Sequence, residues 1–289
     1  MTLHFAYGMV CRGGFHYYRV LFTQMRLNPP QPSGIIYRLS GRILLLSCII
    51  HPDATKPAPT KWENKVMTLT CQQLLQKHNH VWHKATIHPF LEQCKLGTIK
   101  PEQFNTWLVQ DYLFVLEFTR LIGRVLAAAP TAHFDTLLSG ASAIKDELAW
   151  FREKAMERSL NLNTQKQPAC NQYCHFMQTL WDMPYPVQVT AFWAIELAYN
   201  QGWQLPGQMS EPYNEFAQRW GNTGFTEYVT LLEKQANQVL PEASESIQQQ
   251  AESAFLQIAQ LEAEFWQMAF NAGTVVPNNG THSPVFNDP

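Results

Sequence analysis

The chain has 289 residues, with 21 Lys and Arg against 23 Asp and Glu, so its formal net charge is −2. This balance argues against a dedicated nucleic-acid binder, which usually carries a clustered basic excess. Hydrophobic residues make up 46 % and aromatic residues 12 % of the chain, which excludes wholesale disorder and permits a large core.

The charge is distributed unevenly along the chain. Residues 1–66 contain eight basic and two acidic residues, a formal charge of +6, whereas 67–289 carry −8. Several prolines interrupt the first segment, which shows neither helical nor strand periodicity. Its longest apolar run, 43–50, is far shorter than the ~20 residues of a membrane helix and lies too far along for a secretory signal. We expect 1–66 to be a disordered or mis-called N-terminal extension, with Met67 as the alternative start.

Helix-compatible segments follow one another from Met67 to Phe270. We expect helices near 68–84, 102–129, 133–157, 168–181, 186–203, 211–219, 223–238 and 243–270. No run alternates convincingly as a strand, so the chain is predicted to be all-α, an antiparallel bundle of helices joined by short connections. The tail, 271–289, is rich in Gly, Pro and Asn and is expected to be flexible.

Three of the predicted helices carry a carboxylate where the apolar stripe should continue. Asp111 interrupts the stripe of 102–129, Glu196 that of 186–203 and Glu262 that of 243–270. Spacings of three and four place each acid on the buried face of its helix. A buried carboxylate must be paired, hydrogen-bonded or protonated, and basic residues near these stripes are few. A group outside the protein is therefore a candidate partner for these acids.

A fourth acid, Glu147, also approaches a core stripe. It receives less weight, because its face is less apolar and because Lys145 and Arg152 lie close in sequence.

Several other chemistries find little support in the sequence. Cys170 and Cys174 lie four residues apart, but a metal site needs more ligands in orderly spacing, so the two are expected to belong to the core. No histidine follows a Glu at the spacing of a di-iron bundle. The cysteines show no spacing pattern typical of disulfides, which suits a reducing cytoplasm. We predict no metal and no organic cofactor.

Ordered motifs within about 67–270 resemble those of a known family. The segments are WHKATIHPF at 82–90, GTIKPEQFNTWLVQDYLFVLEF at 97–118, GASAIKDELAWF at 140–151, YPVQVTAFWAIELAY at 185–199, RWGNTGFTEY at 219–228 and LEAEFWQM at 261–268. Together they resemble the TenA proteins, the thiaminase-II or aminopyrimidine aminohydrolase family, and within it the glutamate-type branch similar to plant seed-maturation proteins. The resemblance implies a haem-oxygenase-like helical bundle that binds no haem.

The resemblance also implies a function in thiamin salvage. The expected substrate is the pyrimidine moiety of degraded thiamin, 4-amino-5-aminomethyl-2-methylpyrimidine or its N-formyl derivative. Asp111 matches the family's aspartate that holds the aminopyrimidine edge, and Glu262 its C-terminal catalytic glutamate. Phe114, Phe118 and Tyr173 match aromatic positions around the ring. The nucleophilic cysteine of the other branch is missing from TAFWAIE, and we assign the glutamate of this branch to Glu196.

The residues by themselves are consistent with this implied chemistry. A flat heteroaromatic ring suits a slot lined by aromatic side chains, here Phe114, Phe118, Tyr173, Trp193 and Trp220. Cleavage of a C–N bond needs a proton for the leaving amine and an activated water, roles that two carboxylates of different pKa can divide. Glu262 is the expected acid and Glu196 the group that activates or orients water, although the split could be reversed.

Alternative functions are a non-catalytic protein that binds pyrimidines or other aromatics, and an oxidase on the same bundle, like the pyrroloquinoline-quinone synthases. The expected partner is a small aminopyrimidine, with no nucleic acid and no membrane, in a cytoplasmic homo-oligomer, a dimer or tetramer by family precedent.

Overall fold

The computed structural model describes residues 68–273. The predictions for 1–66 and for the tail beyond Gly273 lie outside these residues. The described part of the chain contains helices and no strand, which confirms the all-α prediction. Its helices are α1 (Cys71–Lys77), α2 (Asn79–Thr86), α3 (Pro89–Leu96), α4 (Pro101–Ala128), the 3-10 turn η1 (Thr131–His133), α5 (Phe134–Glu157), α6 (Pro168–Thr179), α7 (Tyr185–Gln204), α8 (Asn214–Trp220), α9 (Thr223–Val239) and α10 (Glu245–Phe270). In this part of the chain, no helix is long and apolar enough to cross a membrane.

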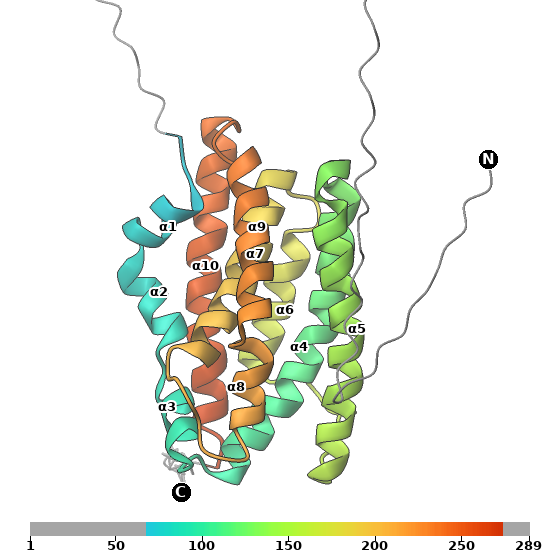
Figure 1. Ribbon diagram of the computed structural model, residues 1–289, viewed down its shortest axis with the longest axis vertical. Coiled ribbons are helices and arrows are strands. Elements are labelled where there is room, and N and C mark those ends of the chain that lie inside the picture. The colour runs from blue at the N-terminus through green and yellow to red at the C-terminus, as the bar shows by residue number, and fades with distance from the viewer. Residues whose placement is uncertain (1–67, 274–289) are drawn as a thin grey trace, which may run out of the picture. The chain divides into compact units, whose positions relative to one another are not determined.

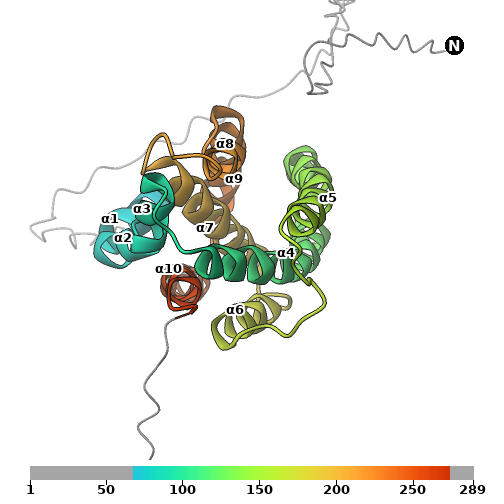
Figure 2. The same ribbon diagram turned by 90° about the horizontal axis from the view of Figure 1, so that it is seen from below.

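Helix α7 lies at the centre of the bundle. It packs against α10, α9, α8, α4 and α2, and the end-on view shows these helices around it (Figure 2). Almost every α7 residue from Val187 to Trp203 is buried, as expected for a helix that is apolar on all sides. The long helices α4, α5, α7, α9 and α10 run along the long axis of the domain, while α1, α2 and α3 follow one another beside α10 (Figure 1).

The expected helices of the later segments appear at nearly the predicted residues, but the first one is divided. The helix predicted over 68–84 breaks at His78, which has φ −114° and ψ 21° and joins α1 to α2. The His78 ring lies 2.5 Å from Glu252 on α10, and Lys77 pairs with the same carboxylate at 2.6 Å. These contacts stabilise the break.

The sequence analysis missed α3 and began α8 too early. Pro89 opens α3 after the cap residue His88, and Gly97 ends it with φ 69°, a left-handed conformation that glycine adopts without strain. A proline at the start and a glycine at the end were the available signals. The helix predicted over 211–219 begins only at Asn214, because residues 211–213, with Pro212, form a turn.

Closely packed aromatic side chains fill the interior where α4, α7, α8 and α10 meet. The ring centroids of Trp107 and Trp203 lie 5.1 Å apart, and Trp220 lies 5.6 Å from Trp203. Trp266 stacks on Phe90 of α3 at 5.4 Å. Buried aromatic side chains remove roughly 150–250 Å² each from water, so this cluster fixes the helices that carry the three buried acids.

Gly140 on α5 permits the close approach of Tyr228 on α9. A Cβ atom at position 140 would lie 2.2 Å from the Tyr228 hydroxyl and 2.9 Å from its ring. We therefore expect Gly140→Ala to lower the free energy of unfolding by about 1–3 kcal/mol, as overpacked positions do. Gly123 on α4 is the matched control: nothing lies within 4 Å of its added Cβ, and Gly123→Ala should stabilise by up to about 1 kcal/mol. Urea denaturation measures both, and equal effects would contradict the packing described.

Candidate functional site

A small cavity lies between α4, α5, α7 and α8. Its lining residues are Phe114, Val115, Phe118, Glu147, Ile195, Glu196, Tyr199 and Trp220. The cavity volume is about 20 Å³, room for roughly one water molecule. A heteroaromatic ring therefore enters only if lining side chains rotate, and the acids predicted from the sequence lie in or directly behind this lining.

The aromatic wall of the cavity comes mainly from α4. Phe114 and Phe118 stack at 5.9 Å, and Phe118 lies 5.0 Å from Phe192 with nearly parallel rings. Phe114 also contacts Tyr173 of α6 at 4.8 Å. Phe114 and Phe118 are four residues apart, so both lie on one face of α4, as the sequence predicted.

Asp111 lies behind the cavity and is fully buried. Tyr199, which lines the cavity, donates its hydroxyl hydrogen bond to Asp111 Oδ1, and Oδ2 has no hydrogen-bond partner. Burial raises the pKa of Asp111 well above its usual range; the Tyr199 bond opposes this, and the charges of Glu147 and Glu262 add to it. Burial therefore favours the protonated carboxyl group, and one of its oxygens is available to a ligand.

Glu262 on α10 forms the second buried acid and tyrosine pair. Tyr173 donates to Glu262 Oε1 at 2.7 Å, and the glutamate is 1 % exposed. Burial raises the pKa of Glu262 to about 8, and the hydrogen bond from Tyr173 lowers it only in part. Glu262 therefore holds a proton at neutral pH, and Phe114 joins this pair to the cavity.

Glu196 on α7 lines the cavity itself and is almost fully buried. Burial raises the pKa of Glu196 well above its usual range, and the charge of Glu147 raises it further, while the Tyr228 hydroxyl opposes both. Glu196 and Tyr199 lie one turn apart on the same face of α7, which brings an acid and the partner of Asp111 to one cavity.

Glu147 on α5 lines the same cavity, although the sequence analysis did not place it in the site. The indole N–H of Trp220 donates to Glu147 Oε1 at 3.2 Å. Burial raises the pKa of Glu147 to about 7, and the Arg219 charge and the Trp220 bond lower it. Lys145 and Arg152, the neighbours that argued against Glu147, are exposed. The signal was present in the apolar residues Ile144 and Phe151, three and four residues away.

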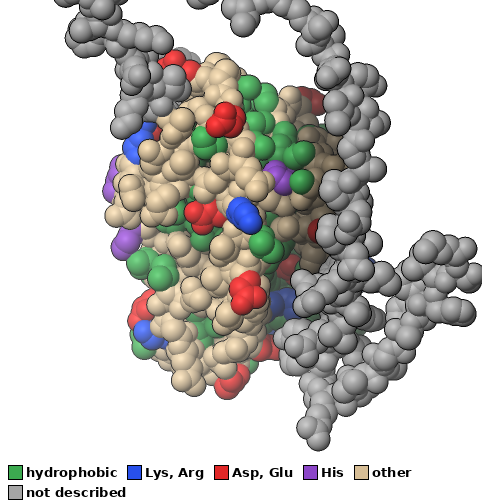
Figure 3. All heavy atoms as spheres, turned by 45° about the horizontal axis from the view of Figure 1, so that its top comes forward, with side chains coloured by type: hydrophobic (Ala, Val, Ile, Leu, Met, Phe, Trp, Pro, Cys, Tyr) green, Lys and Arg blue, Asp and Glu red, His purple; other side chains and the backbone are tan. Residues whose placement is uncertain are grey.

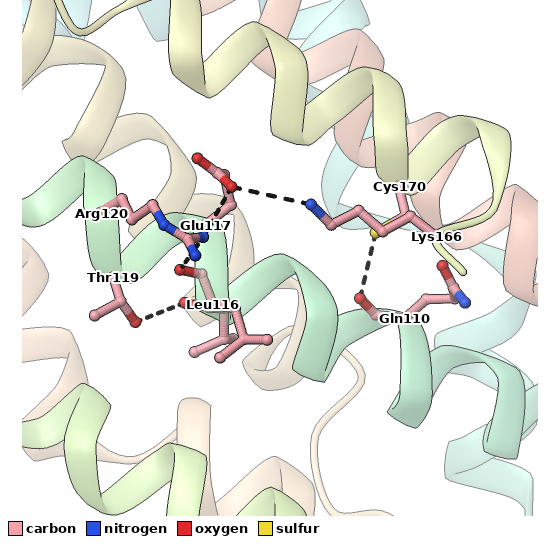
Figure 4. A network of polar contacts seen from close by, with 8 residues as sticks. Gln110, Leu116, Glu117, Thr119, Arg120, Lys166 and Cys170 are labelled. Carbon is pink, nitrogen blue, oxygen red and sulfur yellow. Dashed lines mark hydrogen bonds and ion pairs between the residues drawn. The ribbon is translucent and has the colours of Figure 1, made fainter. Parts of the chain in front are cut away.

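Another buried acid of α4 shows how this chain neutralises a structural carboxylate. Glu117 on α4 pairs with Arg120 at 3.0 Å and Lys166 at 3.9 Å, as Figure 4 shows. Asp111, less than two turns away on the same helix, has a tyrosine instead of a cation. Asp111 therefore differs from Glu117 in its partner, a neutral hydroxyl in place of two cations.

The remaining predicted residues divide between the site and the core. Trp220 and Tyr173 lie where the slot prediction expected them, in or against the cavity wall. Trp193 does not: it is fully buried and stacks on Phe255 of α10 at 6.1 Å. Because α7 is apolar all round, its stripe did not indicate which aromatic faces the cavity, and the prediction for Trp193 is corrected here.

The two cysteines of α6 are buried, as expected of core residues, and the Cys170 thiol donates to the Gln110 carbonyl at 3.4 Å (Figure 4). Within 68–273, no three His, Cys, Asp or Glu side chains are grouped as metal ligands.

On the face seen in Figure 3, acidic and basic side chains are scattered among neutral ones.

The raised pKa of Glu262 has a consequence for stability. The unfolded chain loses this proton near 4.5, the ordinary pKa of a glutamate, whereas the folded chain keeps it to about pH 8. The unfolded state thus binds fewer protons between these values, and stability falls as pH rises. Glu262→Gln cannot ionise, so between pH 5 and 8 its free energy of unfolding should fall less steeply than that of the wild type, by about 1.4 kcal/mol per pH unit. Denaturant titrations at several pH values measure this, with Glu264→Gln on the same helix as control, and parallel wild-type and Glu262→Gln curves would contradict it.

Comparison with known proteins agrees with the fold and with the motifs. The model of the TENA/THI-4/PQQC family matches residues 75–272. A soybean (Glycine max) relative described as a probable bifunctional TENA-E protein is 34 % identical over 221 residues, 72 % of this chain and 96 % of the relative. The aminopyrimidine aminohydrolase of Halalkalibacterium halodurans is 24 % identical, over 68 % of this chain and 94 % of that enzyme.

A solved structure shows the same architecture. The crystal structure of a TenA homologue from Pyrococcus furiosus superposes with a TM-score of 0.66 at 28 % identity, over 69 % of this chain and 98 % of that one. The helical bundle described above is thus the TenA-type bundle that the sequence motifs implied. The family model and the soybean relative together establish that this chain belongs to the TENA/THI-4/PQQC family.

Proposed function

We propose that this protein is a thiamin-salvage hydrolase that acts on the pyrimidine moiety of degraded thiamin, without a cysteine nucleophile. The observation that carries the proposal is the set of carboxyl groups around one aromatic cavity, with Asp111 and Glu262 held by tyrosines rather than by cations. The names of the soybean and Halalkalibacterium relatives support the same reaction class.

Asp111 is proposed to recognise the aminopyrimidine edge. A protonated carboxyl group has one donor and one acceptor, and the edge presents the complementary ring nitrogen and exocyclic amine. Oδ2 is available for this contact, and rotation of the Tyr199 ring opens the path from the cavity to Asp111. Phe114, Phe118 and Trp220 then face the ring of the substrate.

Glu262 is proposed as the general acid and Glu196 as the carboxyl group that binds the attacking water. Water adds its oxygen to the carbon that bears the leaving nitrogen and gives one proton to a carboxylate of the cavity, while the C–N bond breaks and the Glu262 proton goes to that nitrogen. The aminomethyl substrate then gives a hydroxymethylpyrimidine and ammonia. The same groups acting at the formyl carbon give an aminomethylpyrimidine and formate.

We expect Glu262→Gln to lower kcat by about 10²–10⁴-fold while KM and product affinity change little, because the amide keeps the Tyr173 contact but holds no transferable proton. Release of ammonia and formate from the two substrates measures turnover, and calorimetry measures binding. Cys174→Ser, a change outside the cavity lining, is the control. A wild-type protein that binds the aminopyrimidine but releases neither product would favour the non-catalytic binding protein instead.

Residues 67–270 are proposed to carry the whole activity. The family model begins at Leu75 and ends at Ala272, and the cavity residues all fall within this range. A chain that begins at Met67 should therefore show the kcat/KM of the full-length protein within about twofold and the same unfolding midpoint. Loss of turnover on removal of 1–66 would show that this segment contributes to the site.

A further inference from the structure

Two carboxylates from different helices line the same small cavity. Glu147 comes from α5 and Glu196 from α7, and the cavity holds about one water. The Trp220 indole fixes Glu147 Oε1 from α8 at 3.2 Å. An acid that lines the same water-sized space as Glu196 is in position to act on a water held there.

The two carboxyl groups do not ionise independently. Two negative charges in one enclosed space repel each other, so such pairs hold one proton between them over a wide pH range. The Glu147 charge acts on Glu196, on Asp111 and on the Tyr228 hydroxyl, so it influences each neighbouring group of the site. The remaining question is which member of the pair holds the proton.

Arg219 makes the surroundings of the two carboxyl groups different. Its guanidinium lies over the Trp150 ring, 4.4 Å from the centroid, at the outer side of the cavity wall. Arg219 directly precedes Trp220 in the chain, and its positive charge acts on Glu147. Asp146 and Glu215 also act on Arg219, and they stabilise it as a cation. Glu196 is almost fully buried and has Tyr228 as its neighbour.

The titratable and charged groups that act on this pair or on its neighbours come from six helices. They are Asp111 (α4), Asp146 (α5), Tyr199 (α7), Glu215 and Arg219 (α8), Tyr228 (α9) and Glu262 (α10). Arg219 is the cation among them, so it decides where the negative charge settles.

We propose that Glu147 is a further catalytic residue, the ionised member of a proton-sharing pair with Glu196, and that Arg219 is the positioning residue that holds the negative charge on Glu147. This inference rests on the proposed hydrolysis. One O–H bond of the water breaks, its proton goes to Glu147, and its oxygen attacks the substrate carbon, while Glu196 keeps its proton and orients the water. Glu147 is partly exposed, so it releases this proton to solvent after turnover, and Glu262 takes up a proton in place of the one it gave.

The test compares Arg219→Met with Arg219→Lys. Loss of the cation raises the pH at which Glu147 ionises, so the acidic limb of the kcat/KM profile of Arg219→Met should move up by about one pH unit. Arg219→Lys keeps the charge and should restore most of the wild-type limb. Arg120→Met, which removes an exposed arginine of α4, should leave the limb unchanged. A lower rate in Arg219→Met with an unshifted limb would mean a merely structural role and would overturn the proposal.

Two further measurements separate this proposal from the proposed function. Glu147→Gln can still accept the Trp220 bond and should lower kcat by at least about 10²-fold with little change in KM. Carbon-13 NMR of labelled glutamate, with Glu147 assigned from the Glu147→Gln spectrum, follows its ionisation directly and needs no substrate. An upward shift in Arg219→Met supports the pair even if neither pyrimidine is hydrolysed, in which case only the proposed function fails. An unchanged titration would overturn the pairing whatever the activity.

Discussion

The structure depends on one electrostatic constraint: three buried acids, Asp111, Glu196 and Glu262, and the partly buried Glu147 gather around one aromatic cavity, and the protein supplies little positive charge to balance them. Asp111 and Glu262 are stabilised by tyrosine hydroxyls, and Glu196 lies beside Tyr228. Burial of an unpaired carboxylate costs several kcal/mol, so these groups keep their protons at neutral pH. The chain has the means to neutralise buried acids elsewhere, as Glu117 with Arg120 and Lys166 shows. The lack of such cations at the cavity is therefore specific to the site.

This constraint determines the chemistry available. Protonated carboxyl groups donate hydrogen bonds and protons, whereas ionised ones only accept them. A cavity with several protonated acids and one that ionises near neutrality contains both an acid and a base without a metal ligand set or a cysteine nucleophile. Arg219 and Trp220 differ from the tyrosines because they stabilise the charged form of their partner, Glu147. In the proposed reaction, the two kinds of partner thus divide the acids into proton donors and a proton acceptor.

Helical periodicity accounts for what could be predicted from the sequence. Asp111, Glu196 and Glu262 each interrupt an apolar stripe, and all three are buried, because the spacing of three and four fixes the face of a helix. Helical periodicity could not place residues where a helix is apolar on every face, where the partners come from another helix, or where the helix is short. On α7 every face is apolar, so Trp193 could not be told from a cavity residue. On α5 the sequence neighbours of Glu147 point to solvent, and its actual partners, Arg219 and Trp220, come from α8. The short helix α3 gave too few residues for a period to be recognised.

The central claim is that the protonated Asp111 reads the edge of an aminopyrimidine. The most direct measurement is calorimetric titration of wild-type protein with 4-amino-5-hydroxymethyl-2-methylpyrimidine and with its analogue that carries oxygen in place of the 4-amino group. A site built to bond the amine rejects the analogue strongly, so we expect at least about 100-fold weaker binding of the oxygen analogue, and loss of that discrimination in Asp111→Asn. Equal affinity of the wild-type protein for the two compounds would contradict the account.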